Sequence, residues 1–314
     1  MEDPSAEVAA WQVAPYRKME MEKLFSILSK QGIKLSDQTF VSYAESCESP
    51  EELVDCLLLE DCSEEEYEKA YLALFELWRR LLPRNQTLSI FGDELDHLIF
   101  LYDAGQLLDE EDMQNILSEL EDILDDTADK GIGPEEAFQM VTQYCAHDIE
   151  AFLYDYIIQQ MDEGSDTYAS ELIDGFYEYV QSRRWFDFLK ARLFASRDSE
   201  EAGSLLLGIL ELQEEDPDLE LSFEIARFVV NRGDTYLFIM AAKSLLSQIE
   251  REEDFKALLH LVAEFYRCLD EEGEEKAALD VICKRENIKD DADVTPSDKS
   301  LVLEFLKDPE RDKI

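Results

Sequence analysis

The stretch SEEEYEKAYLALFELWRRLLP (63–83) indicates most directly which fold this chain adopts. Four aromatic residues recur in it three or four positions apart: Tyr67, Tyr71, Phe75 and Trp78. This spacing places them on one face of an α-helix. Ser63 and Glu66 form a capping box at its start, and Pro83 ends it. The stretch therefore predicts a helix over 64–82 with its aromatic face in the core.

The same start signal recurs along the chain. A capping residue, a proline at the first helical position and then acidic residues occur in SPEEL (49–53), GPEEAF (133–138) and DPDLELSFEIARFVV (216–230). In the last of these, Asp216 and Pro217 predict the helix start. The alternation typical of strands is nearly absent, so we expect about fourteen to sixteen helices and no sheet. The predicted class is all-α, with antiparallel hairpins stacked as an α-solenoid.

Composition shifts divide this predicted array into regions. Residues 1–14 are expected to be a flexible lead, 15–88 an N-terminal helical region, and 89–288 a helical-repeat region. Residues 289–314 are expected to be a linker and a terminal helix. The stretch LPRNQTLS (82–89) is the predicted break between the two helical regions.

Three stretches have a similar shape, in which an aromatic-rich helix is followed by a turn and a second helix: 176–194, 223–246 and 262–286. In the last, EGEEKAALDVI (272–282) has Gly273 at the turn and Ala278 as a small packing residue. It resembles a tetratricopeptide unit, although Tyr266 stands where that family has a small residue and the downstream proline is missing. The resemblance, confined to the C-terminal third, implies a hairpin array of the tetratricopeptide or HEAT type that binds peptides or proteins.

Acidic residues dominate the charge, with 75 Asp and Glu against 29 Lys and Arg and a net charge of −46. Such a charge repels nucleic acid and anionic membranes, and it attracts basic partners. We expect a non-enzymatic protein that binds a basic protein or peptide as an adaptor, a regulator or a holding chaperone. One alternative is an acidic mimic of nucleic acid that inhibits a DNA- or RNA-binding protein. Another is a calcium-responsive helical protein.

The calcium alternative rests on DDTADKGIGPEE (125–136). Counted as a twelve-residue calcium loop, it has Asp125, Thr127, Asp129 and Glu136 at ligand positions 1, 3, 5 and 12. Lys130, however, stands where the loop needs glycine. The competing interpretation is a helix junction, in which Gly131 ends one helix and Pro134 begins the next.

The scarce basic residues gather beside aromatic ones in a single stretch. The predicted binding surface consists of Arg183, Arg184, Trp185, Phe188, Lys190 and Arg192. A cationic and aromatic surface of this kind suits an acidic or aromatic peptide. Alternatively, Arg183 and Arg184 end a helix, where cations suit its dipole, and the aromatic rings belong to the core.

Catalytic signals are weak. The three histidines, His97, His147 and His260, fall in no known catalytic motif, and we predict no enzyme. His97 with Asp93 and Asp96 is interpreted as a charge cluster on a helix. The six cysteines form no CxxC pair and are expected to be small buried residues of a cytoplasmic protein. The first eleven residues lack the pattern of a signal peptide, and no apolar run is long enough for a membrane span.

Overall fold

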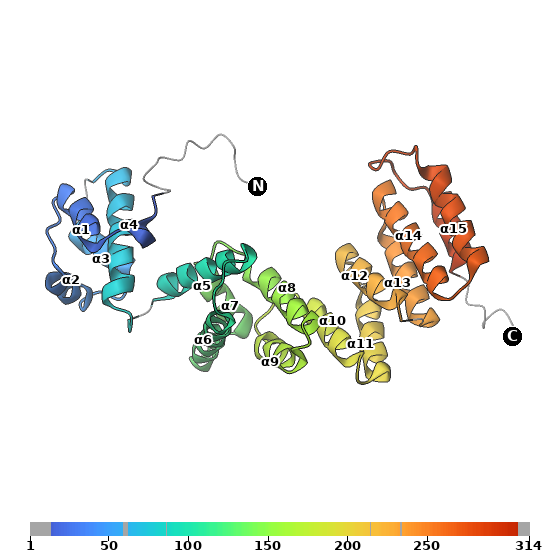
Figure 1. Cartoon of the computed structure of the whole chain (residues 1–314), viewed down its shortest axis with the longest axis horizontal. Helices are drawn as coiled ribbons and strands as arrows, with labels where there is room; N and C mark the ends of the chain where they lie inside the picture. Colours follow the sequence, from blue (N-terminus) through green and yellow to red (C-terminus); the bar gives the residue numbers. More distant parts are fainter. Residues whose placement is uncertain (1–13, 59–61, 86, 214, 233, 307–314) are drawn as a thin grey trace. The chain divides into compact units, whose positions relative to one another are not determined.

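The computed structural model describes residues 14–58, 62–85, 87–213, 215–232 and 234–306 (Figure 1). It confirms the all-α prediction, because these residues form sixteen α-helices and one short 3-10 helix and contain no β-strand. No helix within these ranges is long and apolar enough to cross a bilayer. The predicted flexible lead lies, up to residue 13, outside the described residues.

The chain divides into two compact units, residues 1–149 and 150–314. The first contains the 3-10 helix η1 (Tyr16–Lys18) and seven α-helices: α1 (Met21–Lys30), α2 (Asp37–Ala44), α3 (Pro50–Leu57), α4 (Glu64–Leu81), α5 (Leu88–Asp103), α6 (Glu110–Asp129) and α7 (Pro134–Thr142). The helix α8 (Ile149–Asp162) begins at the division. The predicted break at 82–89 lies inside the first unit, between α4 and α5.

The helix starts follow local capping chemistry. Ser63 and Glu66 form the predicted capping box of α4, and α3 and α7 begin at the predicted Pro50 and Pro134. The prediction for 216–230 was wrong by two residues, because Asp218 rather than Asp216 caps this helix. The Asp218 carboxylate accepts a 3.0 Å hydrogen bond from the Leu221 amide. It thereby satisfies an N–H group that the first helical turn leaves unpaired.

The aromatic face of α4 packs on the core of the first unit, as the spacing predicted. Trp78 is fully buried, and its indole Nε1 donates to the carbonyl of Asn85 at 2.8 Å. The other three rings are partly buried against the same core. The hydroxyls of Tyr67 and Tyr71 each lie 2.9 Å from a carboxylate of α3. The start of α4 is therefore polar and partly exposed, whereas the side chain of Trp78 is buried in the core.

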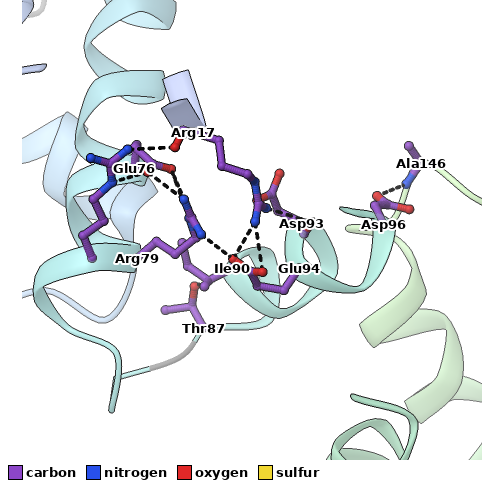
Figure 2. Close-up of polar contacts among 10 residues, drawn as sticks. Arg17, Glu76, Arg79, Thr87, Ile90, Asp93, Glu94, Asp96 and Ala146 are labelled. Atoms are coloured by element: carbon purple, nitrogen blue, oxygen red, sulfur yellow. Dashed lines mark hydrogen bonds and ion pairs between the residues drawn. The ribbon is translucent and has the colours of Figure 1, made fainter. Parts of the chain in front are cut away.

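A cluster of charged side chains joins η1, α4 and α5 within the first unit (Figure 2). Arg17 donates to Glu94 at 2.9 Å and is paired with Asp93. Arg79 bonds Glu94 at 2.8 Å and Glu76 at 2.7 Å. These contacts attach the start of α5 to α4 and to the segment that precedes α1.

Arg80 completes this cluster, which consists of Arg17, Arg79, Arg80, Glu76, Asp93 and Glu94 and is called here the six-charge cluster. Arg80 is paired with Glu76 and donates to the carbonyl of Met19 at 2.7 Å. Glu76 is only 4% exposed. Burial disfavours ionisation of Glu94, but Arg17 and Arg79 outweigh it and lower the pKa of that carboxyl. The three carboxylates thus meet three guanidinium groups.

The second unit consists of α8 together with α9 (Asp166–Phe176), α10 (Arg183–Phe194), α11 (Ser199–Leu212), α12 (Leu219–Val230), α13 (Thr235–Gln248), α14 (Glu252–Cys268), α15 (Glu272–Arg285) and α16 (Pro296–Phe305). Its closest helix contacts are between α10 and α11, between α12 and α13, and between α14 and α15. The last two pairs overlap two of the three similar stretches, 223–246 and 262–286. In the stretch 176–194, α10 contacts α11 more closely than α9.

The segment after α15 is attached to the second unit by hydrogen bonds. The amides of Glu252 and Glu253 donate to the carbonyls of Ala292 and Asp290 at 2.9 and 3.1 Å. In α16, Val302 is fully buried. The predicted linker, residues 289–298, is therefore held along the start of α14, and the last helix packs on the core. Residues 307–314 lie outside the described part.

The cysteine prediction was wrong. Cys56, Cys268 and Cys283 are exposed, and Cys47, Cys62 and Cys145 are partly exposed. Each lies on an amphipathic helix or beside one, where the apolar face is filled by larger side chains. A small thiol at the edge of such a face remains in contact with solvent.

Candidate functional site

The first residues of the predicted basic and aromatic surface hold a connection within the second unit. Arg183 and Arg184 begin α10, so the interpretation that they end a helix was wrong. Arg184 donates to the carbonyl and the carboxylate of Asp216 at 2.5 and 2.6 Å. The Nε1 atom of Trp185 donates to Asp218 at 2.8 Å. Both side chains thereby fix the segment between α11 and α12.

Two further residues of this predicted surface are also engaged inside the unit. Phe188 is fully buried and meets the ring of Phe228 edge-on, with centroids 5.6 Å apart. The Lys190 ammonium lies 3.7 Å from the centre of the Tyr177 ring. Helix periodicity explains both positions, because side chains two positions apart, such as Phe188 and Lys190, point to nearly opposite sides of α10.

Arg192, in the last turn of α10, lies in a different environment that the sequence did not indicate. Its guanidinium carbon lies 5.9 Å from the centre of the Phe228 ring, and that of Arg232 lies 4.2 Å from the same ring. Phe228 comes from α12, and Arg232 follows that helix directly. We call Arg192, Arg232 and Phe228 the Phe228 arginine pair. Its members lie up to forty positions apart in the sequence, so no local motif could reveal it.

The two arginines differ in their partners. Arg192 has a long ion pair with Asp162, at 3.5 Å. Arg232 donates to the carbonyl of Ala195 at 3.1 Å and has no carboxylate partner among the described residues. Burial and the nearby charge of Arg192 lower the pKa of the Arg232 guanidinium. Positive charge is therefore concentrated at this place in a chain that is acidic elsewhere.

Tyr154 of α8 borders the same place. Its ring meets Trp185 edge-on at 5.0 Å, and its hydroxyl oxygen is buried. Burial and the charge of Glu224 raise the pKa of Tyr154, while Arg192 acts in the opposite direction. The helices α8, α10 and α12 thus each contribute a side chain around the Phe228 arginine pair.

The predicted calcium segment forms a helix junction. Asp125, Thr127 and Asp129 lie in the last two turns of α6, and the Thr127 hydroxyl donates to the carbonyl of Ile123 at 2.7 Å. Lys130 ends the helix, and Gly131 takes the left-handed φ of +90°. Glu136 lies in the first turn of α7. No group of three His, Cys, Asp or Glu side chains suited to a metal is found in the described residues.

The predicted charge cluster on α5 is divided between two partners. Asp93 faces Arg17, whereas Asp96 accepts a 2.6 Å hydrogen bond from the amide of Ala146 (Figure 2). It also accepts one from the amide of His147 at 3.0 Å. The His147 Nδ1 atom also lies 2.6 Å from Asp96. The carboxylate thereby fixes the backbone between α7 and α8.

A cysteine beside this Asp–His contact invites comparison with a nucleophilic site. Burial, followed by the charge of Asp96, raises the pKa of the Cys145 thiol to about 12. Such a thiol stays protonated near neutral pH, whereas cysteine nucleophiles depend on a lowered pKa. The arrangement fits a role in structure.

Comparison with protein-family models, with curated proteins and with solved structures finds no match to this chain.

Proposed function

We propose that the second unit is an array of helical hairpins that binds a mainly basic protein or peptide, as an adaptor, a regulator or a holding chaperone does. The observation that carries this proposal is the spacing of the helices. The helix α8 and the first helices of the three pairs α10–α11, α12–α13 and α14–α15 begin at Ile149, Arg183, Leu219 and Glu252, which are 34, 36 and 33 residues apart. Tetratricopeptide repeats have a period of about 34 residues.

The packing between pairs supports the same proposal. The first helix α12 contacts α10 and α14, and the second helix α11 contacts α13. Contacts of first helices with first helices, and of second with second, are what stacked hairpins require. The small residues Ala226 on α12 and Ala242 on α13 are fully buried in the core that these helices share.

The charge supports a basic partner. A net charge of −46 attracts cations over a distance, and salt weakens that attraction. Since hairpin arrays use the surface of several successive repeats, charges on α8 and α12 should matter more than equal charges outside the array. This expectation separates a binding surface from general solubility.

The test immobilises the full chain and measures partner capture from the native cell extract in about 50 mM and about 500 mM salt. A variant with Asp155→Asn and Glu224→Gln neutralises carboxylates of α8 and α12. Its matched control, Asp122→Asn with Asp126→Asn, removes the same charge from exposed positions of α6. We expect a basic partner that salt releases and that the first variant, but not the control, captures poorly.

Two results would overturn the proposal. Equal capture by both variants would assign the charge to solubility. Recovery of many unrelated DNA- and RNA-binding proteins would instead favour the nucleic-acid mimic, whose carboxylates act along one continuous face.

A further inference from the structure

The Phe228 arginine pair places two guanidinium groups around one ring, and among the described residues only Arg192 of the two has a carboxylate within ion-pair distance. Both guanidinium carbons lie within 6 Å of one ring centre, so they are at most about 10 Å apart. Arg232 has no carboxylate partner among the described residues, in a chain with 75 acidic residues. A guanidinium that packs on an aromatic ring still directs its N–H groups outward in its own plane, where they can donate hydrogen bonds.

The carboxylate near Arg192 is weakly held. Its 3.5 Å separation from Asp162 exceeds the usual 2.7–2.9 Å of a charge-assisted hydrogen bond, and the Asp162 side chain is 69% exposed. By contrast, Arg285 bonds Glu252 at 2.5 and 2.7 Å in a buried contact. A ligand oxygen could therefore replace Asp162 at Arg192 at small cost.

The neighbouring helices supply further polar groups. The hydroxyl of Tyr154, on α8, is buried beside Arg192, which acts on it by charge and by hydrogen bonding. Glu224 on α12, which is paired with Arg227 at 2.5 Å, and Asp162 on α8 place carboxylates close by. The patch thus offers donors for one anion, surrounded by acceptors for cations.

Resting on the proposed function, we propose that Arg192 and Arg232 bind one carboxylate of an otherwise basic partner peptide. Two guanidinium groups match the two oxygens of a carboxylate in charge and in hydrogen-bond geometry. The surrounding acidic surface selects basic residues on either side of that carboxylate. Together, the two features set the register of the peptide along the array, which overall charge attraction alone cannot do.

The carboxylate could be the C-terminus of the peptide or an acidic side chain, and the test separates the two. Three libraries of lysine-rich dodecapeptides serve as probes: one with a free C-terminus, one amidated, and one amidated with a single internal glutamate. Binding to the full chain is measured by fluorescence anisotropy. The variant is Arg232→Gln, and the matched control is Arg267→Gln, which removes one exposed arginine of α14.

We expect tighter binding of one carboxylate-bearing library than of the plain amidated one. Arg232→Gln should weaken that binding about ten- to hundredfold, as the loss of a charge-assisted hydrogen bond does, and Arg267→Gln should leave it within about twofold. Salt-sensitive binding that ignores both the carboxylate and Arg232→Gln would overturn this assignment and leave the proposed function intact. No binding by any library would overturn both.

Discussion

In the six-charge cluster of the first unit, three guanidinium groups face three carboxylates across η1, α4 and α5 (Figure 2). In the second unit, Arg232 lies on an aromatic ring and has no carboxylate partner among the described residues. Arginine side chains thus hold helices together in the first unit, whereas Arg232 carries an uncompensated charge in the second. In a chain with few cations, what an arginine touches indicates whether it holds the fold together or remains open to a ligand.

The largest expected effect concerns a third setting, the buried Arg285. It bonds Glu252, which is fully buried, and Asp298 of α16, and it stacks 4.7 Å from the centre of the Phe255 ring. Arg285→Ala would leave a buried carboxylate unpaired, and this loss costs about 3–5 kcal/mol. Urea unfolding should show that decrease, whereas Arg267→Ala, at an exposed pair, should change stability by less than about 1 kcal/mol. Equal losses of stability in the two variants would show that the contacts of Arg285 with Glu252 and Asp298 do not stabilise the fold.

A smaller loss is expected in the six-charge cluster. Glu76→Ala removes the carboxylate that Arg79 and Arg80 share, but these arginines are 20% and 26% exposed and regain water. We expect a decrease of about 2 kcal/mol in the free energy of unfolding, measured in urea. Glu65→Ala on the same helix, at a carboxylate that is 61% exposed, should cost less than about 1 kcal/mol. If Glu76→Ala lowers the free energy of unfolding no more than Glu65→Ala does, the six-charge cluster does not stabilise the first unit.

Lowering the pH from 4 to 2 should weaken the contact between Arg285 and Asp298. Burial opposes ionisation of Asp298, but hydrogen bonds from Arg285 and Thr295 lower its pKa to about 2 from 3.8. A lowered folded-state pKa contributes stability above pH 4 and loses it as pH falls toward 2. After allowance for solvent screening, the stability difference between wild type and Asp298→Asn should shrink by about 1 kcal/mol from pH 4 to pH 2. A constant difference in urea titrations across that range would contradict the assignment.

The smallest expected change in stability belongs to Arg232. Its side chain braces no buried carboxylate, and its one hydrogen bond goes to the Ala195 carbonyl at 3.1 Å. Arg232→Gln should therefore alter the free energy of unfolding by less than about 1 kcal/mol. A larger loss of unfolding free energy, measured by thermal or urea unfolding, would show that Arg232 stabilises the fold.

Local chemistry was predictable from the sequence. The capping box at Ser63 and the left-handed Gly131 depend on residues a few positions apart, and both are present as expected. Asp216 was mistaken for a cap because Asp218 offers the same side chain two positions later. The choice between them depends on Arg184, which bonds Asp216 from another helix.

Contacts between distant helices were not predictable from one sequence. The predicted surface over 183–192 relied on neighbours in the chain, yet α10 turns three of those six side chains toward Asp216, Asp218 and Tyr177. Arg192 is brought beside Phe228 and Arg232 only by the packing of α12 on α10. Periodicity predicts which face a residue occupies, but not which residue of another helix it meets.

The central claim is that some arginines stabilise the fold whereas Arg232 is available to a ligand. Its most direct test measures stability and peptide affinity on the same Arg232→Gln sample. If Arg232 serves a ligand, its unfolding free energy should match wild type within about 1 kcal/mol while carboxylate-bearing lysine-rich peptides bind about tenfold more weakly or worse. Unchanged affinity, or a loss of stability equal to that of Arg285→Ala, would contradict that role.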